Sequence, residues 1–117
     1  MSKIAAIFPA FGCAYLGNER HILRGLGGDL DHYLLRAADY TGFDVAAFKA
    51  TRDGSFENEL LSQQAVYIYG AAVSGVLRSS AIHAACAGGY SMGLYAALHH
   101  AGSIEFETGL EMIEHAY

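Results

Sequence analysis

The amino-acid sequence predicts an α/β protein with a parallel sheet. Two short apolar runs, Ile4 to Phe8 and Ala81 to Ala87, suit buried strands, and the longer segments around them show the 3.6-residue spacing of helices. The second run leads into a glycine-containing turn and another helical segment. This order of strand, several helices, strand, tight turn and helix is typical of α/β proteins.

Composition excludes several classes of protein. The 117 residues are 53% hydrophobic and only 16% charged, which is enough apolar material for one compact core and unlike a disordered tail. The 7 Lys and Arg residues are scattered and outnumbered by 12 Asp and Glu, which argues against nucleic acid and against a membrane surface as partner. No apolar run approaches the roughly 20 residues of a membrane helix, and Pro9 interrupts any signal peptide. We therefore expect a cytoplasmic protein with reduced thiols at Cys13 and Cys86.

The first half of the chain begins with the strand Ile4 to Phe8, which ends at Pro9 because proline cannot donate a ladder hydrogen bond. A glycine-rich loop follows, with a short helix around Glu19 to Arg24. Apolar residues at helical spacing then predict an amphipathic helix from Asp31 to Tyr40, and Gly42 supplies its stop signal.

The second half begins with a short helix and a polar surface loop within residues 43–56. The longest helix is predicted from Asn58 to Arg78, and because it is apolar nearly all round it should be buried. The run Ala81 to Ala87 should be a central strand of the sheet. Two further helices are predicted, from Ser91 to His100 and from Phe106 to His115.

The sequence Gly89-Tyr90-Ser91-Met92-Gly93 lies between a predicted strand and a predicted helix, which is the context of a nucleophile elbow. A serine in such a sharp turn has a strained backbone, and glycines on either side remove side chains that would collide. The start of the next helix offers N–H groups to a developing oxyanion, with Met92 as the expected donor. A purely structural turn that lets strand and helix pack closely explains this pentapeptide equally well.

Three separated segments, in the right order, resemble the malonyl-CoA:acyl-carrier-protein transacylase family, which includes the acyltransferase domains of fatty-acid and polyketide synthases. They are Ile7-Phe8-Pro9-Ala10-Phe11-Gly12, Ser62-Gln63-Gln64-Ala65, and the stretch from Gly88 through Tyr95-Ala96-Ala97-Leu98 and Ala101-Gly102-Ser103 to Phe106-Glu107 and Leu110. The resemblance implies an α/β-hydrolase-like acyltransferase domain with a parallel sheet and a nucleophile elbow.

The resemblance also implies the chemistry, which is acyl transfer in fatty-acid or polyketide biosynthesis. Ser91 would accept the acyl group of an acyl-CoA or acyl-carrier-protein thioester, and the backbone N–H groups of Met92 and Phe11 would form the oxyanion hole. The substrate-binding positions would be Gln63, Tyr90 and Ala116. The implied partners are acyl carrier protein and acyl-CoA, whose CoA or phosphopantetheine thioester is a substrate, and no tightly bound cofactor is expected.

Four positions depart from the family pattern. Phe11 stands in place of glutamine, Tyr90 in place of histidine, Leu94 in place of glutamate, and Ala116 in place of the arginine that selects malonyl groups. No arginine follows Arg78. An arginine would pair the free carboxylate of a malonyl group through two N–H donors, and a carboxylate that leaves water without such a partner is unfavourable. These changes favour an apolar, non-malonyl acyl group, although ordinary drift of core residues explains them nearly as well.

The family's catalytic histidine and its ferredoxin-like subdomain lie downstream of the matching segments. We therefore expect residues 1–117 to be the N-terminal portion of a single acyltransferase-like domain, with the remainder of the domain or a second chain supplying the base that a serine nucleophile needs. Of the histidines present, His99 and His100 are expected on the surface, whereas His83 and Cys86 are expected in the core. No HExxH spacing occurs, so no metal is predicted.

Two other functions remain open at this point. The same site could belong to a hydrolase that clears acyl groups from carrier proteins. Alternatively, the chain could be a degenerate acyltransferase module without catalysis, which the missing base and the four departures would explain.

Overall fold

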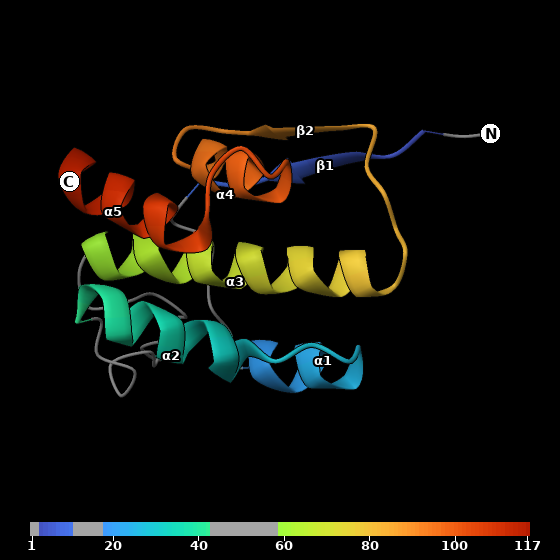
Figure 1. The fold of residues 1–117 in the computed structure, drawn as a ribbon, viewed down its shortest axis with the longest axis horizontal. Helices are drawn as coiled ribbons and strands as arrows, with labels where there is room; N and C mark the ends of the chain where they lie inside the picture. The colour runs from blue at the N-terminus through green and yellow to red at the C-terminus, as the bar shows by residue number, and fades with distance from the viewer. Residues whose placement is uncertain (1–2, 11–17, 43–58) are drawn as a thin grey trace.

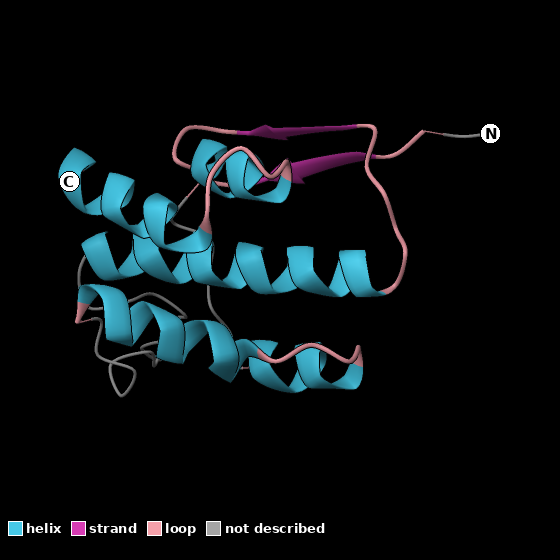
Figure 2. Cartoon of the chain, viewed as in Figure 1, coloured by secondary structure: helices cyan, strands magenta, loops and turns pink. Residues whose placement is uncertain are grey.

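The structure is a computed structural model that describes residues 3–10, 18–42 and 59–117. Its elements in chain order are β1 (Ala5–Phe8), α1 (Glu19–Gly25), α2 (Leu30–Thr41), α3 (Glu59–Ser79), β2 (Cys86–Gly89), α4 (Gly93–His100) and α5 (Phe106–Ala116) (Figures 1 and 2). The mixed α/β architecture confirms the predicted fold class. The helix expected within residues 43–56 lies outside the described residues, as do Phe11 and Cys13.

The two strands form a parallel sheet, in a register that runs from Ala5 opposite Cys86 to Phe8 opposite Gly89. Helix α4 contacts both strands and also packs on α3, so it lies between the sheet and the helical layer. Helix α3 runs through the middle of the molecule, with α1 and α2 on its far side and α5 against both α2 and α3 (Figure 1). Because parallel strands carry the chain in one direction, both strands end at the same edge, next to the start of α4.

The predicted helices are confirmed where the structure describes them. Helix α2 has the expected signals at both ends, since the Asp29 side chain accepts a hydrogen bond from the His32 N–H at 3.3 Å and Gly42 has a left-handed φ of 73°. Helix α3 is the longest, with 21 residues, and α5 begins at Phe106 as expected.

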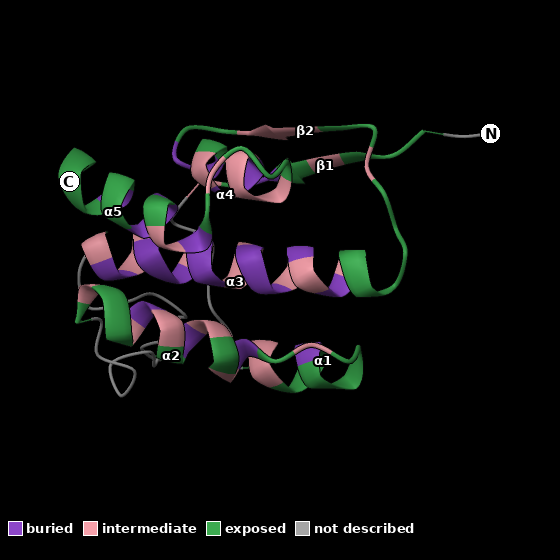
Figure 3. Cartoon of the chain, viewed as in Figure 1, coloured by how far each residue is buried: buried purple, intermediate pink, exposed green. Residues whose placement is uncertain are grey.

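The core is centred on α3, as its apolar composition predicted (Figure 3). By length and composition alone, α3 is apolar enough to cross a membrane, contrary to our expectation that no run would reach that length. However, its most apolar stretch is 56% buried within this structure, against α1, α2, α4 and α5. These contacts describe the central helix of a folded core.

The second strand differs from the prediction. It begins at Cys86 rather than Ala81 and continues to Gly89, because a strand can extend only as far as its partner β1. The preceding residues instead reverse the chain after α3, with Ala81 at a left-handed φ of 57° and the Ile82 N–H bonded to the Leu77 carbonyl oxygen at 2.9 Å. The prediction of a buried Cys86 and a buried His83 was therefore wrong, and both residues are exposed.

Candidate active site

Ser91 lies in the tight turn between β2 and α4, at the carboxyl end of the sheet. Its φ is 52°, a left-handed conformation that is strained for a residue with a side chain. Helix α4 begins at Gly93 and not at Ser91 as predicted, because the turn itself takes up the first residues. The Gly93 N–H bonds the Tyr90 carbonyl oxygen at 2.9 Å and the Leu94 N–H bonds that of Ser91 at 3.1 Å. Ser91 is thus exposed on a hydrogen-bonded turn.

The glycines on either side of Ser91 are required by close backbone approaches. A Cβ atom on Gly89 would overlap the backbone of Gly93, and one on Gly93 would lie 2.6 Å from the carbonyl oxygen of Pro9 and closer still to that of Phe8. Packing alone therefore explains both glycines. It does not explain why a serine, rather than a third glycine, occupies the left-handed position between them, which is a pattern typical of a functional residue.

The start of α4 offers a backbone donor beside Ser91. Met92 is the N-cap residue of α4, and among the described residues its N–H has no hydrogen-bond acceptor. The turn is held to the end of β1 by a bond from the Tyr90 N–H to the Phe8 carbonyl oxygen at 3.1 Å. The N–H of Met92 is therefore available at the end of the helix where partial positive charge accumulates. The second expected donor, Phe11, lies outside the described residues.

No histidine hydrogen-bonds to Ser91 in the part of the chain that the structure describes. His99 and His100 lie in the last turn of α4, at the end remote from Ser91, and they are half-buried against α3 rather than on the surface as we expected. The His100 Nδ1 lies 2.6 Å from the Oγ of the buried Ser74, and burial lowers the pKa of both histidines. The other histidines, His21, His32, His83 and His115, are exposed.

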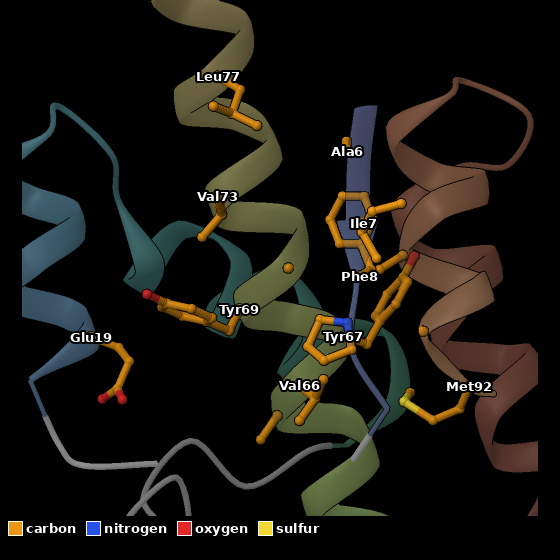
Figure 4. A pocket seen from close by; sticks show the side chains of 15 residues that line it. Ala6, Ile7, Phe8, Glu19, Val66, Tyr67, Tyr69, Val73, Leu77 and Met92 are labelled. Carbon is orange, nitrogen blue, oxygen red and sulfur yellow. The ribbon is translucent and has the colours of Figure 1, made fainter. Parts of the chain in front are cut away.

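A cavity of about 360 Å³ adjoins this turn, between β1, α3 and the start of α4 (Figure 4). We call it the β1–α3 pocket. Its described lining residues are mostly apolar, namely Ala6, Ile7, Phe8, Pro9, Glu19, Ala65, Val66, Tyr67, Tyr69, Gly70, Val73, Leu77, Met92, Gly93 and Ala96.

The other predicted substrate positions do not line this pocket. Gln63 lies in the first turns of α3, where its Nε2 donates to the Oε1 of Glu59 at 3.4 Å. Tyr90 is 76% exposed, and Ala116 is an exposed residue at the end of α5. Among the described residues, Met92 is therefore the one predicted site residue that lines the pocket, and Ser91 is its neighbour in the chain.

Sequence reasoning missed the pocket walls. One wall is a stripe on α3 at Val66, Tyr69, Val73 and Leu77, and another is Glu19 at the start of α1. The spacing of the stripe is visible in the sequence, but what faces it depends on the tertiary arrangement. Within residues 3–10, 18–42 and 59–117, no three His, Cys, Asp or Glu side chains are placed to hold a metal ion.

Comparison with known proteins places the fold. No family model and no curated protein matches the chain. Among solved structures, an acyl carrier protein S-malonyltransferase from Vibrio cholerae O1 matches over 97% of this chain with a TM-score of 0.80 and 23% identity. The chain shares the fold of this transferase. A malonyl-CoA:ACP transacylase from Synechocystis sp. PCC 6803 gives 0.76 and 22% over the same share.

The match extends to a third transferase of this fold, the acyl transferase domain of SpnD in complex with 2-(pent-4-yn-1-yl)malonyl, with a TM-score of 0.67 and 20% identity. The shared part is a minority of each of these proteins. The chain spans 38% of the Synechocystis transacylase, 37% of the Vibrio malonyltransferase and 28% of the SpnD domain.

Proposed function

We propose that this chain takes part in acyl transfer through an acyl-enzyme intermediate on Ser91. The observation that carries the proposal is the left-handed backbone of Ser91, at the carboxyl end of a parallel sheet, between two glycines at which an added Cβ atom would overlap neighbouring backbone. The transferase fold of the matched structures supports the same reaction class. The proposed donor is an acyl-CoA or acyl-carrier-protein thioester, and the proposed acceptor is a carrier-protein thiol.

The proposed reaction has two halves. The Ser91 Oγ attacks the thioester carbonyl carbon while a base takes the hydroxyl proton, and the negative oxygen is held by the Met92 N–H. The carbon–sulfur bond then breaks, and the thiolate leaves with that proton as a thiol. In the second half, a carrier-protein thiol attacks the acyl-serine ester, the carbon–oxygen bond breaks, and the proton returns to Ser91.

We propose that the base comes from outside the described residues, because no hydrogen bond joins a histidine to Ser91 among them. We propose that it is a histidine from the remainder of an acyltransferase domain or from a second chain.

We also propose that a non-malonyl acyl group is preferred, because Ala116 stands where the family resemblance implies an arginine. A charge-assisted hydrogen bond contributes on the order of 1.5 to 3 kcal/mol, so malonyl turnover should fall by roughly one to two powers of ten relative to an arginine-bearing enzyme. Equal or better turnover of malonyl than of monocarboxylic thioesters would contradict this selectivity.

Intact-mass analysis after incubation with acetyl thioester tests the acyl-serine. Because Ser91 is exposed, added imidazole can act as a diffusible base for the chain alone. We expect one added acetyl group, which is absent from Ser91→Ala and retained in Ser103→Ala, a matched exposed serine. An adduct on Cys13 or Cys86, or none with imidazole present, would refute the proposal. Release of free acid, rather than transfer to a carrier thiol, would indicate a hydrolase.

A further inference from the structure

We propose that a second pocket, at the end of β2 opposite to Ser91, binds the phosphate group of a small phosphate ester through Arg78, His83 and His100. The inference goes beyond the proposed function, because it assigns a different site with a different ligand. It depends neither on an acyl-serine nor on the source of a base.

The pocket lies where α3 ends, β2 begins and α4 ends. Its cavity volume is about 320 Å³, and its described lining includes Arg78 in the last turn of α3, residues 82–87 around the start of β2, and His100 at the end of α4. We call it the Arg78 pocket. Because β2 begins at Cys86 and Ser91 follows its last residue, the pocket and Ser91 lie at opposite ends of the strand. A volume of roughly 300 Å³ or more is typical of small-molecule sites.

Arg78 brings a positive charge that no described carboxylate neutralises. Its Nη2 donates to the carbonyl oxygens of His99 at 3.1 Å and His100 at 2.5 Å, which orients the guanidinium across the end of α4. Within the described part of the chain Arg78 forms no ion pair, whereas Arg20 and Arg36 both pair with carboxylates. Its Nε and Nη1 atoms make no hydrogen bond to those residues either. Arg78 therefore keeps its charge and part of its N–H donors for a ligand.

The described lining around Arg78 contains no acidic side chain. The sequence has 12 Asp and Glu residues against 7 Lys and Arg, yet none of these acids is among the described residues of the pocket wall. His83 and His100 line it instead, and each imidazole can donate an N–H. The other described lining residues are apolar, apart from the thiol of Cys86. An anion that enters therefore meets donors and a positive charge, with no like charge from these residues to repel it.

His100 is held in place beside Arg78. Its Nδ1 lies 2.6 Å from the Oγ of the buried Ser74, and its Nε2 makes no hydrogen bond to the described residues. Burial, and after it the charge of Arg78, lowers the pKa of His100. A phosphate dianion between the two side chains would oppose the effect of Arg78 and favour the protonated imidazole, whose N–H then pairs with the ligand.

These groups fit a phosphate better than a carboxylate. A phosphate monoester carries a charge of roughly −1.5 to −2 and three strong acceptor oxygens. The arginine fork can pair with two of these oxygens, and an imidazole N–H with the third. A carboxylate offers two oxygens and a single charge. The cavity also leaves room for an organic group beside Ile82 and the alanines of the wall, so the expected ligand is a small ester and not the bare ion.

Protection of Cys86 from alkylation tests the site without requiring catalysis. The Cys13→Ser chain has Cys86 as its single thiol, and this thiol is exposed in the wall of the pocket. Phenyl phosphate at ten times its Kd should slow alkylation by iodoacetamide roughly tenfold, because about one pocket in ten is then empty. Intact-mass analysis over time measures the rate. Equal protection by benzoate would overturn the phosphate site, and equal protection by inorganic phosphate would overturn the assignment to an ester.

Substitutions in the same Cys13→Ser chain test the proposed donors. Arg78→Gln should raise the Kd of phenyl phosphate by roughly tenfold or more, because a charge-assisted pairing is lost, whereas Arg24→Gln, at an exposed position of α1, should not. Because Arg78 also holds the end of α4, His83→Ala provides a second variant at an exposed side chain. It should weaken protection severalfold, and His21→Ala, its exposed control, should not. Should Arg78→Gln fail to fold, His83→Ala decides, and an unchanged Kd in the folded variants of Arg78 and His83 would overturn the proposal.

Discussion

The helical half of the molecule, formed by α2, α3 and α5, completes its own packing, whereas the sheet half, formed by β1, β2 and the outer surface of α4, does not. In the helical half, Tyr67 is fully buried and Phe106 is 1% exposed. In the sheet half, Ile7 is 72% exposed and Tyr90 is 76% exposed. The candidate site lies in the sheet half, and the β1–α3 pocket lies between the two halves.

The helices of the helical half are joined by specific contacts as well as by burial of apolar side chains. The rings of Tyr67 and Phe106 stack with centroids 5.5 Å apart, and the Tyr67 hydroxyl donates to the Phe106 carbonyl oxygen at 2.8 Å. Arg36 lies 4.9 Å above the Phe106 ring and forms a two-pronged ion pair with Glu107 at 2.7 to 2.9 Å. Burial alone would raise the pKa of Glu107, but the Arg36 hydrogen bond and charge outweigh it and the pKa is lowered. These contacts join α2, α3 and α5 into one unit.

The sheet half has one covered face only. Residues that alternate along β1 point to opposite faces, so Phe8 is buried toward the helices while Ile7 is exposed on the other face. Cys86 at the start of β2 is exposed as well. Parallel sheets are ordinarily covered on both faces, so the apolar side chains of this face need a cover that the described residues do not provide.

Truncation of one large side chain in each half gives the largest expected contrast. Phe106→Ala should lower the free energy of unfolding by about 3 to 5 kcal/mol, because it removes a buried ring and its stacking on Tyr67. Ile7→Ala should change it by less than about 0.5 kcal/mol at concentrations at which the chain is monomeric, since that side chain is exposed in the single chain. Urea denaturation of both variants measures the difference. Similar losses would mean that Ile7 is covered in solution.

A pair of glycine substitutions tests the turn at Ser91. Gly93→Ala should destabilise by about 1 to 3 kcal/mol and impair acylation of Ser91, because the new Cβ would collide with the carbonyl oxygens of Phe8 and Pro9. Gly25→Ala meets nothing within 4 Å and should be neutral or stabilising by about 0.4 to 1 kcal/mol. Thermal melts and intact-mass analysis serve as readouts. A neutral Gly93→Ala would show that the close crossing of β1 and α4 is not maintained.

The exposed sheet face should make the isolated chain self-associate. We expect oligomers or aggregates in size-exclusion chromatography, because contiguous exposed apolar surface promotes association. Ile7→Lys should shift the chain toward monomer, whereas Leu35→Lys, at a position 59% exposed on α2, should not. A cooperative, monomeric melt of the unmodified chain, accompanied by intrinsic esterase activity, would contradict both this expectation and the need for an external base.

Local signals predicted most of the described fold. The Asp29 and Gly42 caps determine where α2 begins and ends, and the nearly all-apolar composition of α3 made it the core helix. The start of β2 was missed by five residues, because the left-handed turn at Ala81 is made by a residue that carries no turn signal. The length of a strand depends on its partner, which local sequence does not contain.

The candidate site, like the fold, was predicted only where it depends on local sequence. Ser91 and its two glycines were predicted from spacing, because the turn they form is local. The β1–α3 pocket was not, because Glu19 and Val73 are far apart in sequence and meet only through packing. His99 and His100 were misplaced for a similar reason, since one eight-residue helix does not show which of its sides will face α3.

The smallest expected effect is a pH dependence of the free energy of unfolding, which arises from His99 on α4. Burial is the main cause that lowers the pKa of His99, with its Tyr67 and Phe106 ring contacts around it. The charges of Arg78 and Arg36 lower it further, while the Ile104 carbonyl and Glu107 raise it. The folded state therefore favours the neutral imidazole of His99 more than the unfolded chain does.

The sign of the effect follows from that preference. Above the ordinary histidine pKa of 6.5, His99 is neutral in both the folded and the unfolded chain. It therefore causes no pH dependence of the free energy of unfolding there. As the pH falls below 6.5, the unfolded chain takes up the proton first, so the free energy of unfolding decreases until the folded-state pKa has also been passed. His99→Gln should reduce this decrease in urea melts across that range, with the remainder arising from His100, whose pKa is lowered by burial as well, whereas His115→Gln, at an exposed position, should leave it unchanged. If stability rose on acidification in the unmodified chain but not in His99→Gln, His99 would have to be paired with a carboxylate. The conclusion that burial lowers its pKa would then be wrong.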